Sequence, residues 1–450
     1  MTGAPPDMTS SKHPDWLVGA WPAPAHGSDG PGRGLGHLGH GFAQGHDHVR
    51  ILMYSHDTFG LGHLRRCRTI AHALVDRFED LHVLIVSGSP IAGAFDFQAR
   101  VDFVKIPSVI KLYNGEYTSL DTQIDITDTL AFREAIIQHT AQLFQPDIFI
   151  VDKEPLGLRG ELERTLTYLK SRGCLLVLGL REVLDSPDLL AAEWARKDVV
   201  HKMDLFYDDI WVYGPEDFWN PLSGLDVPAS LRGRLSFTGF LRRGAPAGAP
   251  GSTSPLPLAP IVVTAGGGGD GACLMRQVLA AHEFDPTLDC PTVLVLGPFM
   301  SAEDRDDLHR RAACRPYLSI VDFDNRPEAL LRDAAAIVGM GGYNTFCEIL
   351  SFDKRALIVP RVHPRREQLI RAQRAMELGI IEMLHPDDAE DPRIMADALR
   401  RLPARPLPSQ TPYVAPLDGL AAICSFVEAY IDERNLPGLR VVESGKTGFP

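Results

Sequence analysis

The sequence predicts an α/β fold of two domains, each built on a parallel sheet, and two observations support this. Short apolar runs alternate with amphipathic helical stretches in two separate parts of the chain. Strands that are apolar throughout and separated by helices are typical of a parallel sheet covered on both faces. Between the two parts, the segment Gly244–Pro260 is rich in Pro, Gly, Ala and Ser, which is the composition of a linker.

The predicted elements follow this alternation. Strands are expected in the first part at Ile51–Tyr54, His82–Val86, Asp147–Val151, Leu175–Leu178 and Ile210–Val212, with helices at His63–Val75, Asp128–Phe144 and Leu158–Lys170. In the second part we expect strands at Ile261–Thr264, Val293–Leu296, Leu318–Val321, Ala335–Val338 and Ala356–Val359. Its predicted helices are Leu274–His282, Asp304–Ala312, Pro327–Arg332, Asn344–Leu350 and Glu367–Leu378. A last helix, Leu417–Tyr430, could pack on either domain.

The chain of 450 residues is long enough for two or three domains of roughly 150 residues each. We expect a disordered tail over 1–48, Rossmann-like domains over 49–243 and 260–410, a linker over 244–259, and a helix with a tail over 411–450. The tail has almost no aliphatic periodicity, so it cannot bury enough apolar area to become ordered. Its histidines allow transition-metal binding as the alternative: His37, His40, His46 and His48.

The charge balance and the cysteines exclude several classes of protein. With 45 Lys+Arg against 58 Asp+Glu, the net charge of −13 argues against nucleic acid as a partner and against strong binding to an anionic membrane. Seven scattered cysteines form neither a disulfide framework nor a zinc motif. No apolar run is long enough to span a bilayer, and no secretory signal is visible. We expect a soluble cytoplasmic protein.

A first candidate site lies at 58–66 (TFGLGHLRR), directly after the first predicted strand and at the start of a helix. Gly60 and Gly62 would let the backbone turn tightly near a ligand. Ligands of open α/β sheets bind at the carboxyl ends of strands, where His63 is expected. An imidazole that titrates near neutrality can take a proton from an attacking hydroxyl. The alternative is that His63 only caps or packs against the loop.

Two further glycine-rich segments follow strands of the second domain. At 264–271 (TAGGGGDG), Gly267 and Gly268 belong to a loop of exposed N–H groups that can surround a diphosphate, although a plain turn is the alternative. At 339–348 (GMGGYNTFCE), the glycines Gly341 and Gly342 permit close approach of a ligand.

Polar side chains follow the second of these loops. Asn344 and Thr345 can cap the helix and donate to phosphate, and Glu348 lies about one turn further on, where it could accept hydrogen bonds from ribose. Shortly afterwards, Glu367 and Gln368 begin the next predicted helix, where polar side chains can meet sugar hydroxyls. Three arginines before them add local positive charge, with solvated surface as the alternative: Arg361, Arg365 and Arg366.

The segments 341–350 (GGYNTFCEIL) and 357–379 (LIVPRVHPRREQLIRAQRAMELG) resemble the donor-binding half of GT-B glycosyltransferases. The closest group is family 28 with the lipid-II-forming GlcNAc transferase, in a bacterial branch of predicted glycosyltransferases. The resemblance covers roughly residues 50–402 and implies two Rossmann-like domains that face each other across a cleft. The GLGH loop is more similar to that of UDP-sugar hydrolases than to the lipid-II enzyme.

The resemblance also implies roles for individual residues. Glu348 would take the ribose hydroxyls, and Glu367 and Gln368 would take the donor-sugar hydroxyls. The diphosphate would be bordered by Gly267, Gly268, Gly341, Gly342, Asn344 and Thr345. The backbone near Phe323 and Asp324 would lie close to the base, and His63 would be the general base. On the acceptor side we expect Gly60, Gly62, Asp152 and Glu154.

The predicted activity is transfer of a hexose or N-acetylhexosamine from a UDP-sugar to a hydroxyl of a carbohydrate or lipid-linked acceptor. It is expected to invert the anomeric centre, to need no metal or other cofactor, and to serve cell-surface polysaccharide or glycolipid synthesis in the cytoplasm, with at most peripheral contact with the inner membrane face. Asp322–Phe323–Asp324 spells DxD, a metal signature of another glycosyltransferase fold, but it lies within the strand–helix repeat. The alternatives are a UDP-sugar hydrolase, a UDP-sugar epimerase and a non-catalytic sugar-nucleotide-binding protein.

Overall fold

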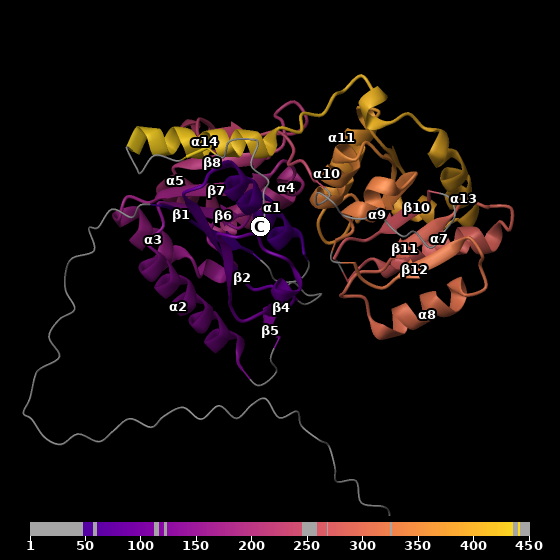
Figure 1. The fold of residues 1–450 in the computed structure, drawn as a ribbon, viewed down its shortest axis with the longest axis horizontal. Coiled ribbons are helices and arrows are strands. Elements are labelled where there is room, and N and C mark those ends of the chain that lie inside the picture. The colour runs from indigo at the N-terminus through magenta and orange to yellow at the C-terminus, as the bar shows by residue number, and fades with distance from the viewer. Residues whose placement is uncertain are drawn as a thin grey trace, which may run out of the picture. The chain divides into compact units, whose positions relative to one another are not determined.

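A computed structural model describes residues 48–56, 61–111, 117–120, 124–244, 259–267, 269–324, 326–434 and 440–441. Two parallel α/β sheets with helices on both faces make up this part of the chain (Figure 1). We call the part built on the first sheet the first lobe and the part built on the second sheet the second lobe. The predicted fold class is therefore confirmed. None of the helices in the described ranges is long and apolar enough to cross a bilayer.

The first lobe contains a seven-stranded parallel sheet in the order β3-β2-β1-β6-β7-β8-β9. Its strands are β1 (Val49–Ser55), β2 (Leu81–Ser87), β3 (Val101–Lys105), β6 (Ile148–Asp152), β7 (Leu175–Arg181), β8 (Asp209–Tyr213) and β9 (Leu235–Phe237), with a small antiparallel pair β4 (Val109–Lys111) and β5 (Tyr117–Ser119) beside them. Its helices are α1 (Gly62–Arg77), α2 (Ile126–Phe144), α3 (Glu163–Ser171), α4 (Pro187–Lys197), α5 (Val199–Phe206) and α6 (Ala229–Arg232). The strand order reverses between β1 and β6, which makes a crevice at their carboxyl ends the expected ligand position.

The second lobe contains a six-stranded parallel sheet in the order β12-β11-β10-β13-β14-β15. Its strands are β10 (Ile261–Thr264), β11 (Thr292–Val295), β12 (Leu318–Val321), β13 (Ala336–Gly339), β14 (Arg355–Ile358) and β15 (Glu382–Met383). Its helices are α7 (Ala272–Phe284), α8 (Ala302–Ala312), α9 (Glu328–Asp333), α10 (Tyr343–Ser351), α11 (Glu367–Glu377), α12 (Pro386–Ala389) and α13 (Pro392–Arg401). Here the order reverses between β10 and β13.

Alternating side chains of β1 explain why both faces of the first sheet are covered. Ile51 and Met53 enter one core with α1, whereas Leu52 and Tyr54 enter another with α2 and α3. All four are fully buried, because successive side chains of a strand point to opposite faces of its sheet. The continuous apolar run predicted as a strand therefore serves two cores at once.

One of these cores continues from the first lobe into the second. At the junction, Phe218 and Phe240 of the first lobe meet Phe346 on α10, with ring centroids 5.2 to 5.5 Å apart. Such aromatic contacts are worth about 0.5–1.5 kcal/mol each beyond the area they bury. The lobes are therefore joined by a shared apolar core as well as by polar contacts.

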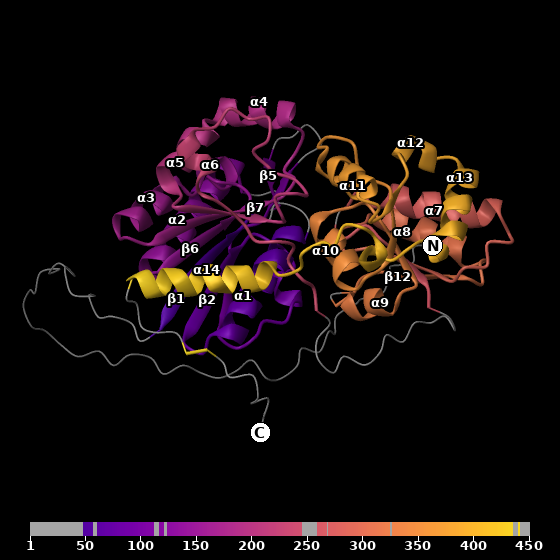
Figure 2. The ribbon, with the colours of Figure 1, turned by 90° about the horizontal axis from the view of Figure 1, so that it is seen from above.

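Helix α14 (Gly419–Arg434) packs on the first lobe, which decides the question that the sequence left open. Figure 2 shows it, in yellow, running beside α1. Ile423 and Val427 are buried in the core shared with α1, and the ring of Phe426 lies 5.9 Å from that of Trp211. The chain thus returns from the second lobe to support the helix that carries His63.

The predicted helix Leu158–Lys170 is wrong at its start. A short 3₁₀ turn covers Leu158–Gly160, and α3 begins only at Glu163. Two residues of this stretch have a positive φ, 51° at Arg159 and 91° at Gly160, and so does Gly157 just before it, at 67°. Because an α-helix needs right-handed angles at consecutive residues, this segment forms a loop at the end of β6 instead.

Candidate functional site

The first site residues lie where β1 ends and α1 begins. His63 is the second residue of α1, so its side chain lies at the carboxyl end of the first sheet. Gly62 starts the same helix, and a Cβ placed on it would lie 3.8 Å from Nδ2 of Asn344 in the second lobe. The predicted Gly60 lies outside the described residues.

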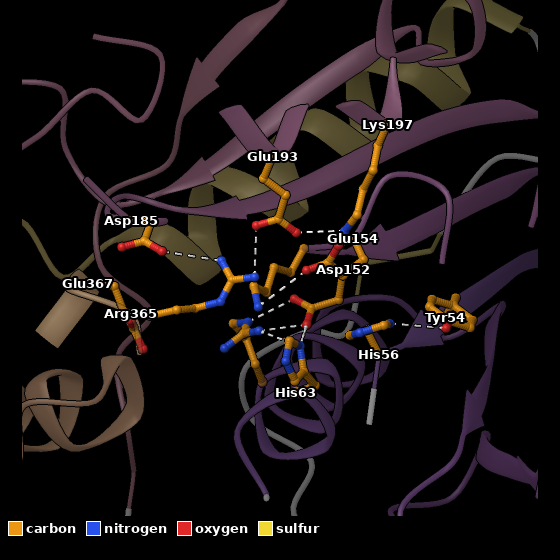
Figure 3. A network of polar contacts seen from close by, with 12 residues as sticks. Tyr54, His56, His63, Asp152, Glu154, Asp185, Glu193, Lys197, Arg365 and Glu367 are labelled. Carbon is orange, nitrogen blue, oxygen red and sulfur yellow. Dashed lines mark hydrogen bonds and ion pairs between the residues drawn. The ribbon is translucent and has the colours of Figure 1, made fainter. Parts of the chain in front are cut away.

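His63 forms a pair with Asp152, the last residue of β6. Nδ1 of His63 lies 2.5 Å from Oδ2 of Asp152 (Figure 3). Arg66, one turn further along α1, donates from Nε to Oδ1 and from Nη2 to Oδ2 of the same carboxylate, at 2.8 and 2.6 Å. This two-point contact fixes the orientation of Asp152, and Asp152 in turn fixes the ring of His63.

The electrostatics leave His63 neutral and able to act as a base. Burial lowers the pKa of His63 from its ordinary value, and Asp152 opposes that shift. Burial alone would raise the pKa of Asp152, but Arg66 and His63 lower it more, so the carboxylate stays ionised. A proton on Nδ1 shared with that carboxylate leaves Nε2 unprotonated, and no described residue bonds to it. The side chain is 21% exposed, which leaves this nitrogen within reach of a ligand.

The second lobe presents its glycine loop and the start of α10 next to this pair. Gly341 has a φ of 77°, and a Cβ on it would come within 2.9 Å of Ile358, so the position requires glycine. Gly342 precedes the helix with open space around it, and no side chain caps α10. The first N–H groups of the helix are therefore available to an anion.

Asn344 and Thr345 are both buried at the start of α10. The amide of Asn344 is used between the lobes: Nδ2 donates to the carbonyl of Gly62 at 3.1 Å, and Oδ1 accepts from Arg243 at 2.5 Å. The second N–H of this amide and the backbone N–H of Asn344 are left to meet a phosphate. The side chain therefore links the two lobes beside His63, a role that its position in the sequence did not suggest.

Glu348 is also engaged across the lobes. Its Oε1 accepts from Nη2 of Arg65 at 2.5 Å, and Arg65 donates from the same nitrogen to Glu328 at 3.0 Å. Glu348 is 2% exposed and the side chain of Arg65 is 14% exposed, so the pair is partly buried. Arg65 belongs to the candidate segment 58–66, but the sequence assigned it no role; its contact with Glu348 comes only from the tertiary structure.

Glu367 and Gln368 begin α11, as predicted, and both contact Arg361. Oε1 of Glu367 accepts from Nη2 of Arg361 at 2.7 Å, and Oε1 of Gln368 accepts from the backbone N–H of Arg361 at 3.0 Å. Oε2 of Glu367 is buried and has no hydrogen-bond partner among the described residues. Burial alone would raise the pKa of Glu367, but Arg181, Arg361 and Lys153 lower it, so it carries a charge.

The remaining residues predicted to bind the donor have fewer contacts with the other predicted site residues. Gly267 packs on Leu61 of the first lobe, since a Cβ on it would lie 2.6 Å from that side chain, and Gly268 lies outside the described residues. Phe323 is 36% exposed, and Asp324 accepts a hydrogen bond from the backbone of Arg326. No described hydrogen bond joins Phe323 or Asp324 to the other predicted site residues.

Within the described ranges, no three His, Cys, Asp or Glu side chains gather in a way that could hold a metal ion. Asp322, the first residue of the DxD sequence, accepts from Nε2 of His309 at 2.8 Å.

Glu154 borders a cavity of about 490 Å³ in the first lobe. The cavity is lined by His56 after β1, by the loop that follows β6, and by residues of α3, α4 and α5. Glu154 itself pairs with Lys153 at 3.4 Å. Sequence reasoning did not single out His56, whose ring centroid lies 5.7 Å from that of His63.

Comparison with known proteins finds a family match within the second lobe. Residues 261–412 match the model of the glycosyltransferase family 28 C-terminal domain. A comparison with curated proteins finds no match.

Solved structures share the fold of both lobes. CalG4, the calicheamicin glycosyltransferase, is 16% identical with a TM-score of 0.54, covering 86% of this chain and 98% of its own. The glycotransferase of kitacinnamycin is 16% identical with a TM-score of 0.56, covering 87% and 100%. A protein from Listeria monocytogenes assigned as a UDP-N-acetylglucosamine 2-epimerase is 10% identical with a TM-score of 0.55, covering 88% and 100%. At these identities the likeness shows the GT-B fold, and together with the family domain it supports sugar transfer as the general activity.

Proposed function

We propose that this protein transfers a hexose or N-acetylhexosamine from a UDP-sugar to a hydroxyl acceptor, with His63 as the general base. The observation that carries the proposal is the contact of His63 Nδ1 with Asp152, itself held by Arg66, beside the uncapped start of α10; with the proton on Nδ1, Nε2 is free to act as a base. A base and an anion-binding helix end at one place are the two parts that glycosyl transfer from a diphosphate requires.

In the proposed step, the acceptor oxygen forms a bond to the anomeric carbon while its proton passes to Nε2 of His63. The bond from the anomeric carbon to the diphosphate oxygen breaks, and its electron pair leaves with the diphosphate. Attack from the side opposite the leaving group inverts the anomeric centre. Negative charge therefore grows on the diphosphate, where the N–H groups that follow Gly342 can stabilise it without a metal.

Glu367 supports a sugar site at the same place. A charged, buried carboxylate oxygen without a partner is costly, and Oε2 of Glu367 is such an atom. A hydroxyl of the donor sugar would satisfy it. Gln368, whose Oε1 already accepts from the backbone of Arg361, would contribute its amide N–H groups.

The finer parts of the proposal rest on the resemblance of 341–350 and 357–379 to the lipid-II-forming group. These are uridine as the base, Glu348 as its ribose contact, and a role in cell-surface polysaccharide or glycolipid synthesis. They also include a cytoplasmic location, with at most peripheral contact with the inner membrane face.

The test begins with binding of nucleotides to the purified full chain. A bound ligand raises the midpoint of thermal unfolding by an amount set by its concentration and dissociation constant. We expect UDP to raise the midpoint more than dTDP, GDP, ADP or CMP does at equal concentration. A larger shift with another nucleotide would contradict uridine as the base.

The second step follows consumption of UDP-glucose, UDP-galactose and UDP-N-acetylglucosamine with and without hydroxyl acceptors. A transferase forms a glycoside and depends on the acceptor. Release of free sugar at the same rate with or without acceptors would favour the hydrolase suggested by the GLGH loop. Binding of UDP with no turnover of any donor would favour a non-catalytic protein.

A further inference from the structure

The cavity of about 490 Å³ in the first lobe has no role in the donor site described above. It lies at the carboxyl ends of β1 and β6, since His56 follows β1 and Glu154 follows β6. Its volume falls within the range of about 300–1,000 Å³ that is usual for small-molecule sites. His56 belongs to its lining, and its ring centroid lies 5.7 Å from that of His63. The cavity therefore extends to the pair of His63 and Asp152.

A buried network determines which nitrogen of His56 carries its proton. The hydroxyl of Tyr54 donates to Oε1 of Glu161 at 2.5 Å, and Glu161 accepts two further hydrogen bonds, both from Arg133, at 2.7 Å each. Burial and Glu161 raise the pKa of Tyr54 well above its ordinary value, so the hydroxyl keeps its proton. Because that proton is directed to Glu161, the Tyr54 oxygen can only accept a hydrogen bond from Nδ1 of His56, 3.3 Å away.

The proton on Nδ1 leaves Nε2 of His56 as a hydrogen-bond acceptor. Burial lowers the pKa of His56 to about 3, so the ring stays neutral at physiological pH and does not become a donor at both nitrogens. No hydrogen bond from a described residue reaches this Nε2. Figure 3 shows His56 between Tyr54 and His63. Two neutral imidazoles, each with an unprotonated Nε2, therefore stand side by side.

The rest of the lining is polar and fits a hydroxylated ligand, and it includes two arginines, Arg159 and Arg196, that can also donate to hydroxyl oxygens. Each of its three acidic side chains already has a cationic partner: Glu154 pairs with Lys153, Glu163 with Lys202 and Glu193 with Lys197. The negative charge of each carboxylate is therefore balanced by its lysine, and no bound cation is needed to balance it. They and the backbone of the glycine-containing loop after β6 still offer hydrogen-bonding atoms to a ligand that is itself rich in hydroxyls.

We propose that the acceptor is a carbohydrate or similar polyol seated in this cavity, with one hydroxyl donating to His56 while a second is activated by His63. The inference rests on the proposed function and adds to it the chemical class of the acceptor and a residue that selects it. His56 does not take the proton of the attacking hydroxyl. It holds the neighbouring hydroxyl, so that the attacking one lies at Nε2 of His63.

The experiment measures transfer to methyl glycosides of glucose, galactose, mannose and N-acetylglucosamine, each also as analogues lacking one hydroxyl, with 1-octanol as a monohydric comparison. It uses the full chain and the variants His56→Phe and His56→Gln. His72→Phe is the matched control, because His72 also lies in the first lobe, on α1, but does not line the cavity.

We expect His56→Phe to raise the KM for the acceptor about tenfold, the effect of one lost hydrogen bond. Affinity for UDP should not change. His56→Gln, which keeps an oxygen that can accept, should recover much of that loss. In the wild type, removal of one particular hydroxyl from the acceptor should cost about as much as His56→Phe does, and in His56→Phe the same removal should cost nothing.

An unchanged acceptor KM in both His56 variants would overturn the inference, and so would a wild type that accepts 1-octanol as well as it accepts the methyl glycosides. A wild type that consumes a UDP-sugar but transfers to no glycoside would also overturn it. A chain that neither binds UDP nor consumes any sugar nucleotide would instead contradict the proposed function. If His56→Phe lowers the midpoint of thermal unfolding, the comparison rests on His56→Gln and on the deoxygenated acceptors.

Discussion

At the scale of single residues, His63 matters because of what holds it. A histidine at the start of a helix is common, but its Nδ1 contact with a buried, arginine-locked carboxylate fixes both its tautomer and its direction. The same logic gives Asp152 a different part from the predicted one. It was predicted on the acceptor side, and the structure shows that Oδ2 contacts His63 and that both of its oxygens accept from Arg66.

Replacing His63 by alanine should lower kcat about 10²–10⁴-fold, because the acceptor hydroxyl loses its base. Affinity for UDP should stay the same, since His63 does not belong to the second lobe. Steady-state rates and calorimetry with UDP check the two parts. His72→Ala on the same helix is the control and should keep wild-type rates; an equal loss in both variants would show damage to α1 rather than loss of a base.

The pH dependence of kcat/KM should report the lowered pKa of His63. A base with a lowered pKa stays unprotonated to more acidic pH, so the rate should rise with pH through a midpoint below 6.5 and then level off. Asp152→Asn removes a charge that raises this pKa, so the midpoint should move lower still. The plateau should fall by up to about 10⁴-fold, because the amide no longer fixes the tautomer. A midpoint above 7 in the wild type would contradict the assignment.

Glu348→Ala should weaken UDP binding by about 10–100-fold if its carboxylate meets the ribose, the usual effect of losing a hydrogen bond to a charged group. Calorimetry with UDP is the measurement. Glu377→Ala, an exposed position at the end of α11, is the control. Unchanged affinity in Glu348→Ala would leave Glu348 only its structural pair with Arg65.

At the scale of elements, α1 carries His63, the proposed base, and is held from two sides. Its N-terminal end meets the start of α10 through the hydrogen bond from Asn344 to Gly62, and its length packs against α14. The second of these contacts joins a segment near the C-terminus to the first lobe. The position of His63 therefore depends on parts of the chain that lie more than 280 residues away from it.

Truncating Ile423 on α14 to alanine should destabilise the protein by about 2–5 kcal/mol, because it leaves a cavity against α1. Denaturant unfolding should show the lower midpoint. Glu428→Ala, at a half-exposed position of the same helix, should leave the midpoint where it is. Equal midpoints for the two variants would mean that α14 contributes little to the first lobe.

At the scale of the whole molecule, arginines link the two lobes through buried contacts. Arg371 of α11 donates from Nε to Glu182 of the first lobe at 2.5 Å, and both are almost fully buried. The ring of Tyr343, at the start of α10, lies 5.6 Å from the guanidinium of Arg66 and 5.8 Å from that of Arg371. Arg66, which binds Asp152, and Arg371, which joins the lobes, therefore both contact the ring of Tyr343.

Arg371→Met should cost about 3–5 kcal/mol, because it leaves the carboxylate of Glu182 buried without its partner. We expect a lower midpoint of denaturant unfolding and a weaker response to UDP. Arg393→Met removes an exposed arginine of the pair with Asp391 and should change neither. An Arg371→Met variant as stable as Arg393→Met would show that Glu182 finds another partner.

The sequence alone was enough to predict the two parallel sheets, because runs such as Ile51–Tyr54 and Ile261–Thr264 report local burial on both faces of a strand. The segment 158–170 was an exception, since its apolar spacing is helical while its backbone at Arg159 and Gly160 is left-handed. The position of His63 at a helix start was likewise local information, given by a strand, two glycines and the helical run that follows.

Only the tertiary structure decided which side chains meet. His63 and Asp152 are 89 residues apart in the sequence and come together because β1 and β6 are neighbours with Ser55 opposite Asp152. The partners of Asn344 and Glu348 come from the other part of the chain. Periodicity reports whether a position is buried, but not against what, because the strand order and the packing of the lobes arise from contacts distributed over the whole chain.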